Sequence, residues 1–227
     1  MTQAVLNGIE ACVFDAYGTL FDVSSVARGA QDALGDRWQA LSDLWRTKQL
    51  QYTWLRGLAG HHAEFWQVTG DALDYAMTTL NIEDRTLRDR LMNLYLSISA
   101  YPEVPAMLAA LKAKGMKLAI LSNGSPSMLA AAVENSGIAH YFDTVLSVEE
   151  VGVYKPHPNV YGMVPRSLGV AKENVCFLSS NGWDAFSAKA FGFQVLWCNR
   201  FAQASERIPA VPDGEIKDLS ALPDWVS

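Results

Sequence analysis

The sequence predicts an α/β fold built on a parallel sheet, because short apolar runs alternate with segments of helical periodicity in residues 1–23 and 98–227. Between these parts, residues 24–97 contain no strand-like run. Half of the 227 residues are hydrophobic and only 19% are charged, so the chain can bury a substantial core. We therefore expect a Rossmann-like parallel sheet core, formed by residues 1–23 and 98–227, with an inserted helical cap subdomain over residues 24–97.

Five apolar segments are expected to be the strands, namely residues 11–15, 117–121, 144–147, 175–178 and 193–198. Polar residues follow three of them. They are Asp15, then Ser122-Asn123-Gly124, then Ser179-Ser180-Asn181 with Asp184 close behind. Because ligands bind at the carboxyl ends of the strands in an open α/β sheet, we expect these groups to meet at one edge.

Helices are expected between the strands, each ending at a glycine that suits a helix terminus. They are residues 104–114 before Gly115, 126–136 before Gly137 and 158–168 before Gly169. Ser125-Pro126 predicts an N-cap residue followed by proline in the first helical position.

In the predicted cap, apolar residues recur at helical spacing, as in Leu41, Trp45, Leu50, Trp54 and Leu58. We expect Trp45 and Trp54 to belong to the core of the cap or to an association surface, and His61-His62 to be an exposed loop pair. An aromatic-rich insertion has apolar surface to spare, which favours a homodimer formed through the cap helices.

The net charge of -6 and the pI near 5.2 argue against a nucleic-acid partner, which requires a basic face. We expect no membrane span, since no apolar run reaches about 18 residues, and no secretory signal in MTQAVLNGIE. The odd set Cys12, Cys176 and Cys198 lies in strand-like segments, which predicts buried free thiols and a cytoplasmic location.

The strand-end residues suggest nucleophilic chemistry. A carboxylate such as Asp15 can attack a substrate and form an ester intermediate. Lys155, in the loop VYKPHP, is expected to keep Asp15 ionised. Thr19, Ser179 and Asn181 are expected to hydrogen-bond the carboxylates and fix their orientation.

Other hydrolytic motifs are incomplete. NGSPS does not match the G-x-S-x-G elbow, because Pro126 follows Ser125. The histidines lack the HExxH metal-binding spacing, and the sequence has no G-x-x-x-x-G-K-[ST] phosphate-binding loop.

Four segments in order, FDAYGTLFD, LSNGSP, YKPHP and SSNGWD, resemble the four motifs of the haloacid dehalogenase superfamily. The resemblance is strongest to its (S)-2-haloacid (L-2-haloacid) dehalogenase branch, to which the cap segment WRTKQLQYTWLR is also similar. It covers nearly the whole chain and thins after about residue 200. Relatives often carry Gln after the Trp-Arg pair, whereas this chain has Thr47, which puts a pocket contact and the preferred chain length of the substrate in question.

Two departures from the phosphatase pattern of this superfamily select the branch. Tyr17 stands where phosphatases carry a second Asp as general acid, and Ser179 stands where an acid helps to hold Mg²⁺. Since a hard cation needs several charged oxygen ligands, we expect no metal and no cofactor. A halide leaving group requires an anion site instead.

The resemblance implies that Asp15 attacks C2 of a short-chain L-2-haloacid with inversion, and that water then hydrolyses the ester to a D-2-hydroxyacid. Water would be positioned by Lys155, Asn181 and Asp184. Thr19, Tyr161 and Ser179 would support the residues that surround the reacting groups. The halide would bind to Arg46, Asn123 and Trp183. The substrate carboxylate would bind to Ser122 and to backbone N–H groups near Ala16 and Tyr17. The alkyl pocket would be walled by Tyr17, Leu50, Phe65 and Trp183.

The expected partners are thus a small 2-haloalkanoic acid, the released halide and a second copy of the chain. Two alternatives stay open from the sequence. One is a phosphatase or phosphonatase of the same superfamily, and the other is a catalytically silent relative that serves as a binding module.

Overall fold

The computed structural model describes residues 6–226, so part of the amino-terminal segment examined for a leader lies outside the described residues. Its centre is a six-stranded sheet in the order β3-β2-β1-β4-β5-β6, and all neighbouring strands are parallel. The strands are β1 (Ala11–Phe14), β2 (Lys117–Ser122), β3 (Thr144–Ser147), β4 (Val175–Ser179), β5 (Gln194–Cys198) and β6 (Gly214–Ile216).

The five expected strands are confirmed to within a residue or two at their ends. Strands β1 and β4 are buried throughout, as expected for central strands covered by helices on both faces. Strand β6 was not expected, because three residues with one buried side chain give no periodic signal. Asp15 lies directly after β1, and Ser179 ends β4, so both are at the carboxyl edge of the sheet.

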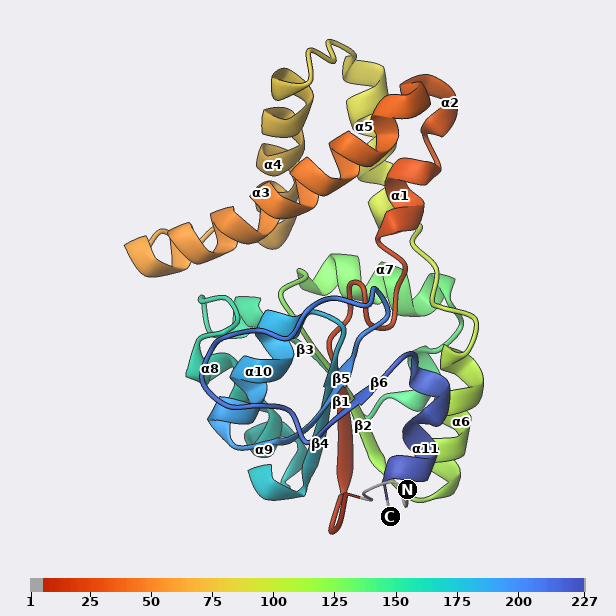
Figure 1. Ribbon diagram of the computed structural model, residues 1–227, viewed down its shortest axis with the longest axis vertical. Helices are drawn as coiled ribbons and strands as arrows, with labels where there is room; N and C mark the ends of the chain where they lie inside the picture. Colours follow the sequence, from red (N-terminus) through yellow and green to blue (C-terminus); the bar gives the residue numbers. More distant parts are fainter. Residues whose placement is uncertain (1–5, 227) are drawn as a thin grey trace.

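Helices cover both faces of the sheet, with α8, α9 and α10 on one side and α6 and α11 on the other (Figure 1). Their bounds are α6 (Val104–Ala113), α7 (Pro126–Asn135), α8 (Pro158–Tyr161), α9 (Met163–Leu168), α10 (Gly182–Phe191) and α11 (Leu222–Trp225). The single helix expected over residues 158–168 is two helices, α8 and α9, with Gly162 between them. Ser125 occupies the N-cap position of α7 as expected, but its side chain makes no capping hydrogen bond.

The first five helices form a separate group beyond the carboxyl edge of the sheet (Figure 1). This helical unit comprises α1 (Ser24–Arg28), α2 (Gln31–Leu34), α3 (Trp38–Ala59), α4 (Phe65–Thr79) and α5 (Arg85–Leu96). The two chain segments that join it to the sheet lie side by side, since Tyr101 N–H donates to Leu20 O at 2.9 Å. The long helix α3 packs along α4 and extends over the edge of the sheet.

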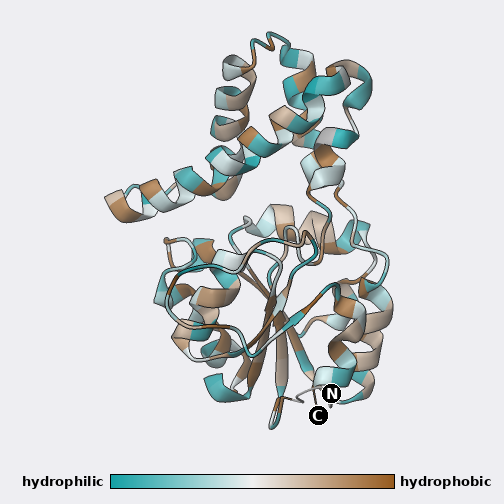
Figure 2. Ribbon diagram, viewed as in Figure 1, coloured by the Kyte–Doolittle hydropathy of each residue, from teal (hydrophilic) through white to brown (hydrophobic). Residues whose placement is uncertain are grey.

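Helix α3 presents different faces to its neighbours. Its buried face is Leu41, Trp45, Gln49 and Thr53, which contact the rest of the helical unit. The stripe expected from the sequence is therefore only partly right, because Leu58 is 88% exposed. Figure 2 shows that hydrophobic residues dominate the strands, whereas polar and apolar residues alternate around α3.

The predicted free thiols are confirmed: Cys12, Cys176 and Cys198 are all buried and unpaired. Cys12 and Cys176 are register partners on neighbouring strands. Within residues 6–226, no helix combines the length and the apolar character needed to cross a bilayer.

Candidate active site

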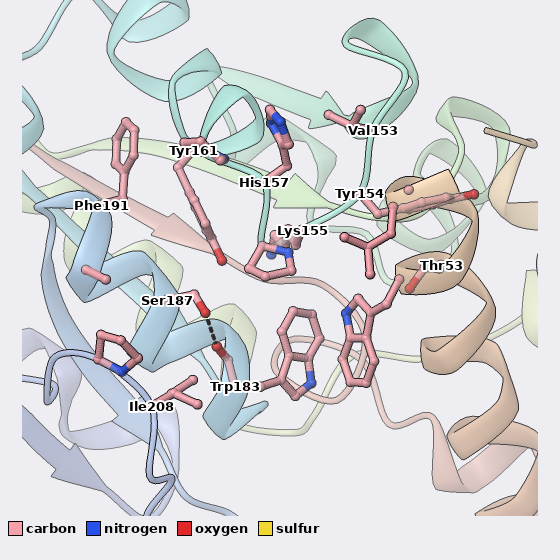
Figure 3. A pocket seen from close by; sticks show the side chains of 17 residues that line it. Thr53, Val153, Tyr154, Lys155, His157, Tyr161, Trp183, Ser187, Phe191 and Ile208 are labelled. Carbon is pink, nitrogen blue, oxygen red and sulfur yellow. Dashed lines mark hydrogen bonds between the residues drawn. The ribbon is translucent and has the colours of Figure 1, made fainter. Parts of the chain in front are cut away.

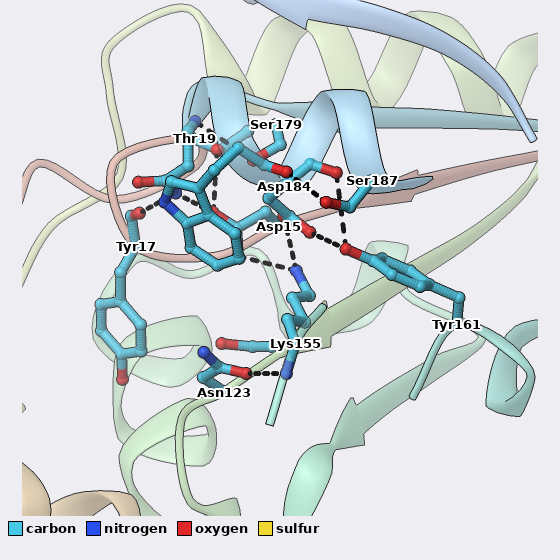
Figure 4. Close-up of polar contacts among 12 residues, drawn as sticks. Asp15, Tyr17, Thr19, Asn123, Lys155, Tyr161, Ser179, Asp184 and Ser187 are labelled. Atoms are coloured by element: carbon cyan, nitrogen blue, oxygen red, sulfur yellow. Dashed lines mark hydrogen bonds and ion pairs between the residues drawn. The ribbon is translucent and has the colours of Figure 1, made fainter. Parts of the chain in front are cut away.

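Asp15 occupies the centre of a buried polar network at the carboxyl edge of the sheet (Figure 4). Its side chain is 9% exposed and accepts three hydrogen bonds from side chains. Lys155 Nζ donates to Oδ1 at 3.0 Å, while Thr19 Oγ1 and Asn181 Nδ2 donate to Oδ2 at 3.1 and 2.8 Å. Because all three partners are donors, the network favours the ionised carboxylate and fixes its orientation.

The ammonium of Lys155 lies between two carboxylates. Its Nζ is 3.0 Å from Asp15 Oδ1 and 2.9 Å from Asp184 Oδ2, and the lysine side chain is almost fully buried. Burial by itself lowers the pKa of Lys155, but the charges of Asp15 and Asp184 outweigh that effect and raise the pKa. The lysine therefore remains charged and supplies the positive charge at the centre of the site.

Asp184 belongs to the first turn of α10 and is completely buried. Burial raises its pKa, and the neighbouring Lys155 ammonium offsets only part of that increase. Tyr161 donates from its hydroxyl to Asp184 Oδ1 at 2.7 Å. The pKa of Tyr161 is itself raised, first by burial and then by the charge of Asp184, so this hydroxyl stays protonated and acts as a donor. A carboxylate with a raised pKa is a stronger base than an exposed one.

Thr19 and Ser179 connect the network to the backbone, because each hydroxyl accepts a hydrogen bond from a backbone N–H group. Thr19 Oγ1 accepts from Ser180 N–H at 2.8 Å while it donates to Asp15. Ser179 Oγ accepts from Asn181 N–H at 3.2 Å, which orients the asparagine. Arg200, which the sequence did not suggest, donates to Thr19 O at 3.0 Å and so holds the backbone of the loop that follows β1.

Arg46 reaches the site from the helical unit. Its Nη2 donates to Asn181 Oδ1 at 3.2 Å, and its Nη1 donates to Gln49 Oε1 at 2.7 Å. The Asn181 amide is thereby engaged at both ends, since its Nδ2 already donates to Asp15. A guanidinium has five N–H donors, so those that remain are available to an anion.

Ser122 ends β2, and Asn123 follows it at the same edge of the sheet. Asn123 Oδ1 accepts from Lys155 N–H at 3.0 Å. This contact assigns the oxygen of the side-chain amide, so its NH₂ group is available to donate to another acceptor. Ser122 Oγ accepts from Gly124 N–H at 3.0 Å. No hydrogen bond of the described residues joins Ser122 directly to the Asp15 network.

Aromatic rings enclose one side of the site. Tyr17 stacks on Phe65 of α4 with ring centroids 6.2 Å apart, and Trp183 meets Trp54 of α3 edge to face at 5.4 Å. Burial, more than nearby charges, raises the pKa of Tyr17 far above its usual value. Its buried hydroxyl has no hydrogen-bond partner within residues 6–226, and with its raised pKa it cannot replace a carboxylic proton donor.

The remaining candidates differ in their placement. Ala16 is fully buried next to Asp15. Leu50 lies one helical turn after Arg46 and is half-buried, with no polar or ring contact that connects it to the network. Thr47 is exposed and follows Arg46 on α3, so its effect on a pocket contact stays a prediction. Trp54 contacts Trp183 of the core, which was not expected.

Sequence reasoning missed the residues that hold Arg46. Gln49 is buried, and its Nε2 donates to Thr69 Oγ1 at 2.8 Å and to Tyr95 Oη at 3.3 Å. A polar residue three positions after Arg46, within the buried face of a helix, was the available signal.

A second missed contact joins the helical unit to the core. The expected exposed pair His61-His62 is wrong for His62, which is half-buried and lies 2.7 Å from Glu149 through its Nε2. Glu149 also accepts from Phe65 N–H at 3.0 Å and thus fixes the start of α4.

The arrangement suits nucleophilic attack by a carboxylate that expels an anion. The Asp15 carboxylate is oriented by neutral donors and an ammonium, and the Arg46 guanidinium reaches the same network through Asn181. In the described part of the chain, no group of three or more His, Cys, Asp or Glu side chains is arranged to hold a metal ion.

Comparison with known proteins identifies close relatives of this chain. A model of the haloacid dehalogenase-like hydrolase family matches residues 9–192. (S)-2-haloacid dehalogenase 1 of Pseudomonas sp. (strain CBS-3) is 42% identical over 219 residues, which cover 96% of each chain.

Solved structures resemble the fold equally closely. A dehalogenase with an intermediate complex superposes with a TM-score of 0.95 at 42% identity, over 98% of this chain and 99% of the other. The L-2-haloacid dehalogenase of Xanthobacter autotrophicus with chloropropionic acid covalently bound has a TM-score of 0.89 at 40% identity, over 95% and 97% of the two chains.

Proposed function

This chain belongs to the haloacid dehalogenase-like hydrolases, and we propose that it hydrolyses the carbon–halogen bond of short-chain L-2-haloacids to give D-2-hydroxyacids. The single observation that carries the proposal is the Asp15 carboxylate, held by Lys155, Thr19 and Asn181 and linked through Asn181 to Arg46. Tyr17, neutral and apolar in its contacts, stands beside it in place of the acid that a phosphatase requires.

In the first step, a carboxylate oxygen of Asp15 forms a bond to C2 while the carbon–halogen bond breaks. The halide leaves with the bonding electrons, and attack from the opposite side inverts C2. The free N–H donors of Arg46, the Asn123 NH₂ group and the Trp183 indole edge stabilise the departing halide. Ser122 and the backbone N–H groups near Ala16 and Tyr17 hold the substrate carboxylate, and Leu50 and Phe65 complete the alkyl pocket with Tyr17.

In the second step, water adds to the side-chain carboxyl carbon of Asp15, and the bond from that carbon to the ester oxygen breaks. The 2-hydroxyacid leaves with an oxygen that came from Asp15, and the oxygen of water remains on the enzyme. Asp184 accepts one proton of the water, with Tyr161 and Lys155 maintaining its orientation through the contacts at 2.7 and 2.9 Å. The second proton of the water passes to the leaving oxygen of the hydroxyacid, and Asp15 is again a carboxylate. Asn181 and Ser179 keep the Asp15 carboxyl in place.

The test is halide release from L- and D-2-chloropropionate, with and without EDTA, by the wild-type protein and by Asp15→Asn. We expect chloride only from the L form, no effect of EDTA, and no release by the variant, while the control Asp36→Asn at an exposed position retains activity. A single turnover in H₂¹⁸O is expected to yield unlabelled hydroxyacid. Phosphate release from esters with Mg²⁺, in place of chloride release, would support the phosphatase alternative.

The helical unit acts as a cap in this proposal. Residues 24–97 close over a core of residues 1–23 and 98–227, and the cap contributes Arg46, Leu50 and Phe65 to the pocket. The contacts of Arg46 with Asn181 and of Glu149 with Phe65 support this role, because each links the helical unit to the core at the site.

We further infer a homodimer formed through the cap and a cytoplasmic location. Leu55 is 61% and Tyr75 41% exposed, and the Lys48 ammonium lies over the Tyr75 ring at 4.2 Å. With Tyr52, which packs against Tyr75, these side chains form an amphipathic patch on α3 and α4 suited to a second copy. The buried free thiols favour a reducing compartment.

A further inference from the structure

A large apolar groove lies beside the site and is not used by the reaction described above (Figure 3). It has a volume of about 730 Å³ and is bordered by helix α3, helix α10 and the loop 153–158. Lys155, Tyr161 and Trp183, which belong to the site or its shell, also line the groove. The groove therefore adjoins the region in which the substrate is bound.

On the helical unit, the groove continues the face of α3 that carries the pocket residues. Arg46 and Leu50 are followed on this face by Trp54 and Leu58, at successive intervals of four residues, and the last two line the groove. From Leu50 to Leu58 the helix rises about 12 Å. The alkyl pocket and the groove are thus successive parts of one helix surface.

On the core, one face of helix α10 likewise runs from the site into the groove. Trp183 lies next to Asp184 at the start of the helix, and Ser187, Ala190 and Phe191 continue its face into the groove. The Trp183 ring, labelled in Figure 3, meets the ring of Trp54 of α3 edge to face and so lies between the two helices. The indole of Trp183 is therefore a wall shared by the alkyl pocket and the groove.

The groove offers no free charge to a polar ligand. Among its lining residues, Lys155 is charged, and its ammonium is already paired with Asp15 and Asp184. The His157 ring accepts from Asn159 N–H at 3.2 Å. The exposed lining includes Leu58 and Ile208, so the surface favours an aliphatic ligand.

We propose that this groove is a distal subsite for the alkyl tail of 2-haloalkanoic acids longer than the short-chain substrates. It rests on the proposed function, because the halogen-bearing C2 must be anchored at Asp15. The tail passes along the Trp183 ring from the alkyl pocket and lies between α3 and α10. Each methylene that leaves water for this surface improves binding by about three- to fourfold.

The first measurement compares unreactive carboxylates as competitive inhibitors of (S)-2-bromopropionate hydrolysis. We expect octanoate to bind at least about tenfold more tightly than propionate, since several methylenes reach the groove. Equal inhibition by the two acids would overturn the proposal.

The second measurement blocks the groove and compares kcat/KM for (S)-2-bromopropionate and (S)-2-bromooctanoate. Ala190→Trp fills the groove from an exposed position of α10, and Ala109→Trp, at an exposed position of α6, is the matched control. Gly57→Phe fills the groove from α3, at a position where an added Cβ meets no atom within 4 Å. Gly57→Ala is its control.

We expect Ala190→Trp and Gly57→Phe to lower kcat/KM for (S)-2-bromooctanoate at least about tenfold. Their kcat/KM for (S)-2-bromopropionate should stay within about twofold of the wild-type value. Equal loss for both substrates, or no loss for the octanoate, would overturn the subsite. Absence of turnover of 2-bromopropionate by the wild-type protein would instead contradict the proposed function, so the two failures are distinguishable.

Discussion

Arg46 and Asn181, 135 residues apart in the sequence, are joined by a hydrogen bond of 3.2 Å from the Arg46 guanidinium to the Asn181 side-chain carbonyl. The other end of the same amide donates to Asp15 at 2.8 Å. The helical unit thereby contacts the nucleophile through one asparagine. Correct placement of Arg46 and correct orientation of Asp15 are consequently coupled.

Arg46→Lys is expected to lower kcat for 2-chloropropionate by about 100-fold or more, because a compact ammonium lacks the planar fork whose two nitrogens contact Gln49 and Asn181. The loss should be smaller for 2-bromopropionate, whose leaving group needs less stabilisation. Steady-state kinetics with both substrates tests this, with the exposed Arg37→Lys as control. An unchanged chloro-to-bromo ratio would remove Arg46 from the halide site.

Gln49→Leu is expected to lower kcat about tenfold by releasing the Arg46 guanidinium from the contact at 2.7 Å. As a positioning residue, Gln49 should alter the chloro-to-bromo ratio in the same direction as Arg46→Lys. Thr53→Val is the matched control, since Thr53 is buried on the same face of α3 and its hydroxyl donates to Leu50 O of the same helix. If both variants reduce activity without altering the ratio, Gln49 has only a structural role.

The acid limb of the pH profile should report Asp184. Burial raises the pKa of this carboxyl, which acts in the hydrolysis of the ester, so loss of kcat on acidification should begin at a higher pH than an exposed aspartate would give. The hydrogen bond from Tyr161 lowers the pKa of Asp184, and its removal in Tyr161→Phe should therefore shift the limb to still higher pH. A limb that stays in place or moves to lower pH would argue against Asp184 as the base.

Lys155→Met should destabilise the fold by about 3–5 kcal/mol at neutral pH, because two buried carboxylates lose their counter-charge. Urea unfolding monitored by tryptophan fluorescence measures the change. The loss of stability should become smaller on acidification, as protonation neutralises the buried Asp184 carboxylate. Lys189→Met, which removes a partly exposed ion pair with Asp213, should cost less than about 1 kcal/mol.

Leu55→Asp is expected to convert the proposed dimer to a monomer, since it places a charge in the centre of the exposed patch of Lys48, Tyr52, Leu55 and Tyr75. Light scattering at micromolar protein measures the mass. Val211→Asp, at an exposed apolar residue outside the helical unit, is the control. A monomeric wild-type protein would contradict the dimer directly.

The strands and their polar ends could be predicted because the signals are local. Asp15 and Ser179 each follow or end an apolar run, and parallel strands align their carboxyl ends whatever the loops between them contain. Lys155 was identifiable as a candidate from its loop, although its position between two carboxylates depends on the packed structure.

Other features depend on contacts between distant segments and left no such signal. Gln49 is one polar residue in a helical stripe, and its role arises only where Thr69 and Tyr95 meet it. The exposure of Leu58 follows from the end of α3 extending past its neighbours, which the spacing of apolar residues does not reveal. Likewise, His62 meets Glu149 across 87 residues of sequence.

Helix α3 serves several neighbours at once: α4 and the cap interior on one face, Asn181 and the groove on another, and the exposed patch on a third. An inserted or deleted residue within it would rotate everything beyond that point by about 100°. The far half of the helix would then offer each neighbour the wrong side chains. This segment is therefore expected to diversify in evolution by substitution, with its length conserved, while the loops at its ends remain free to change in length.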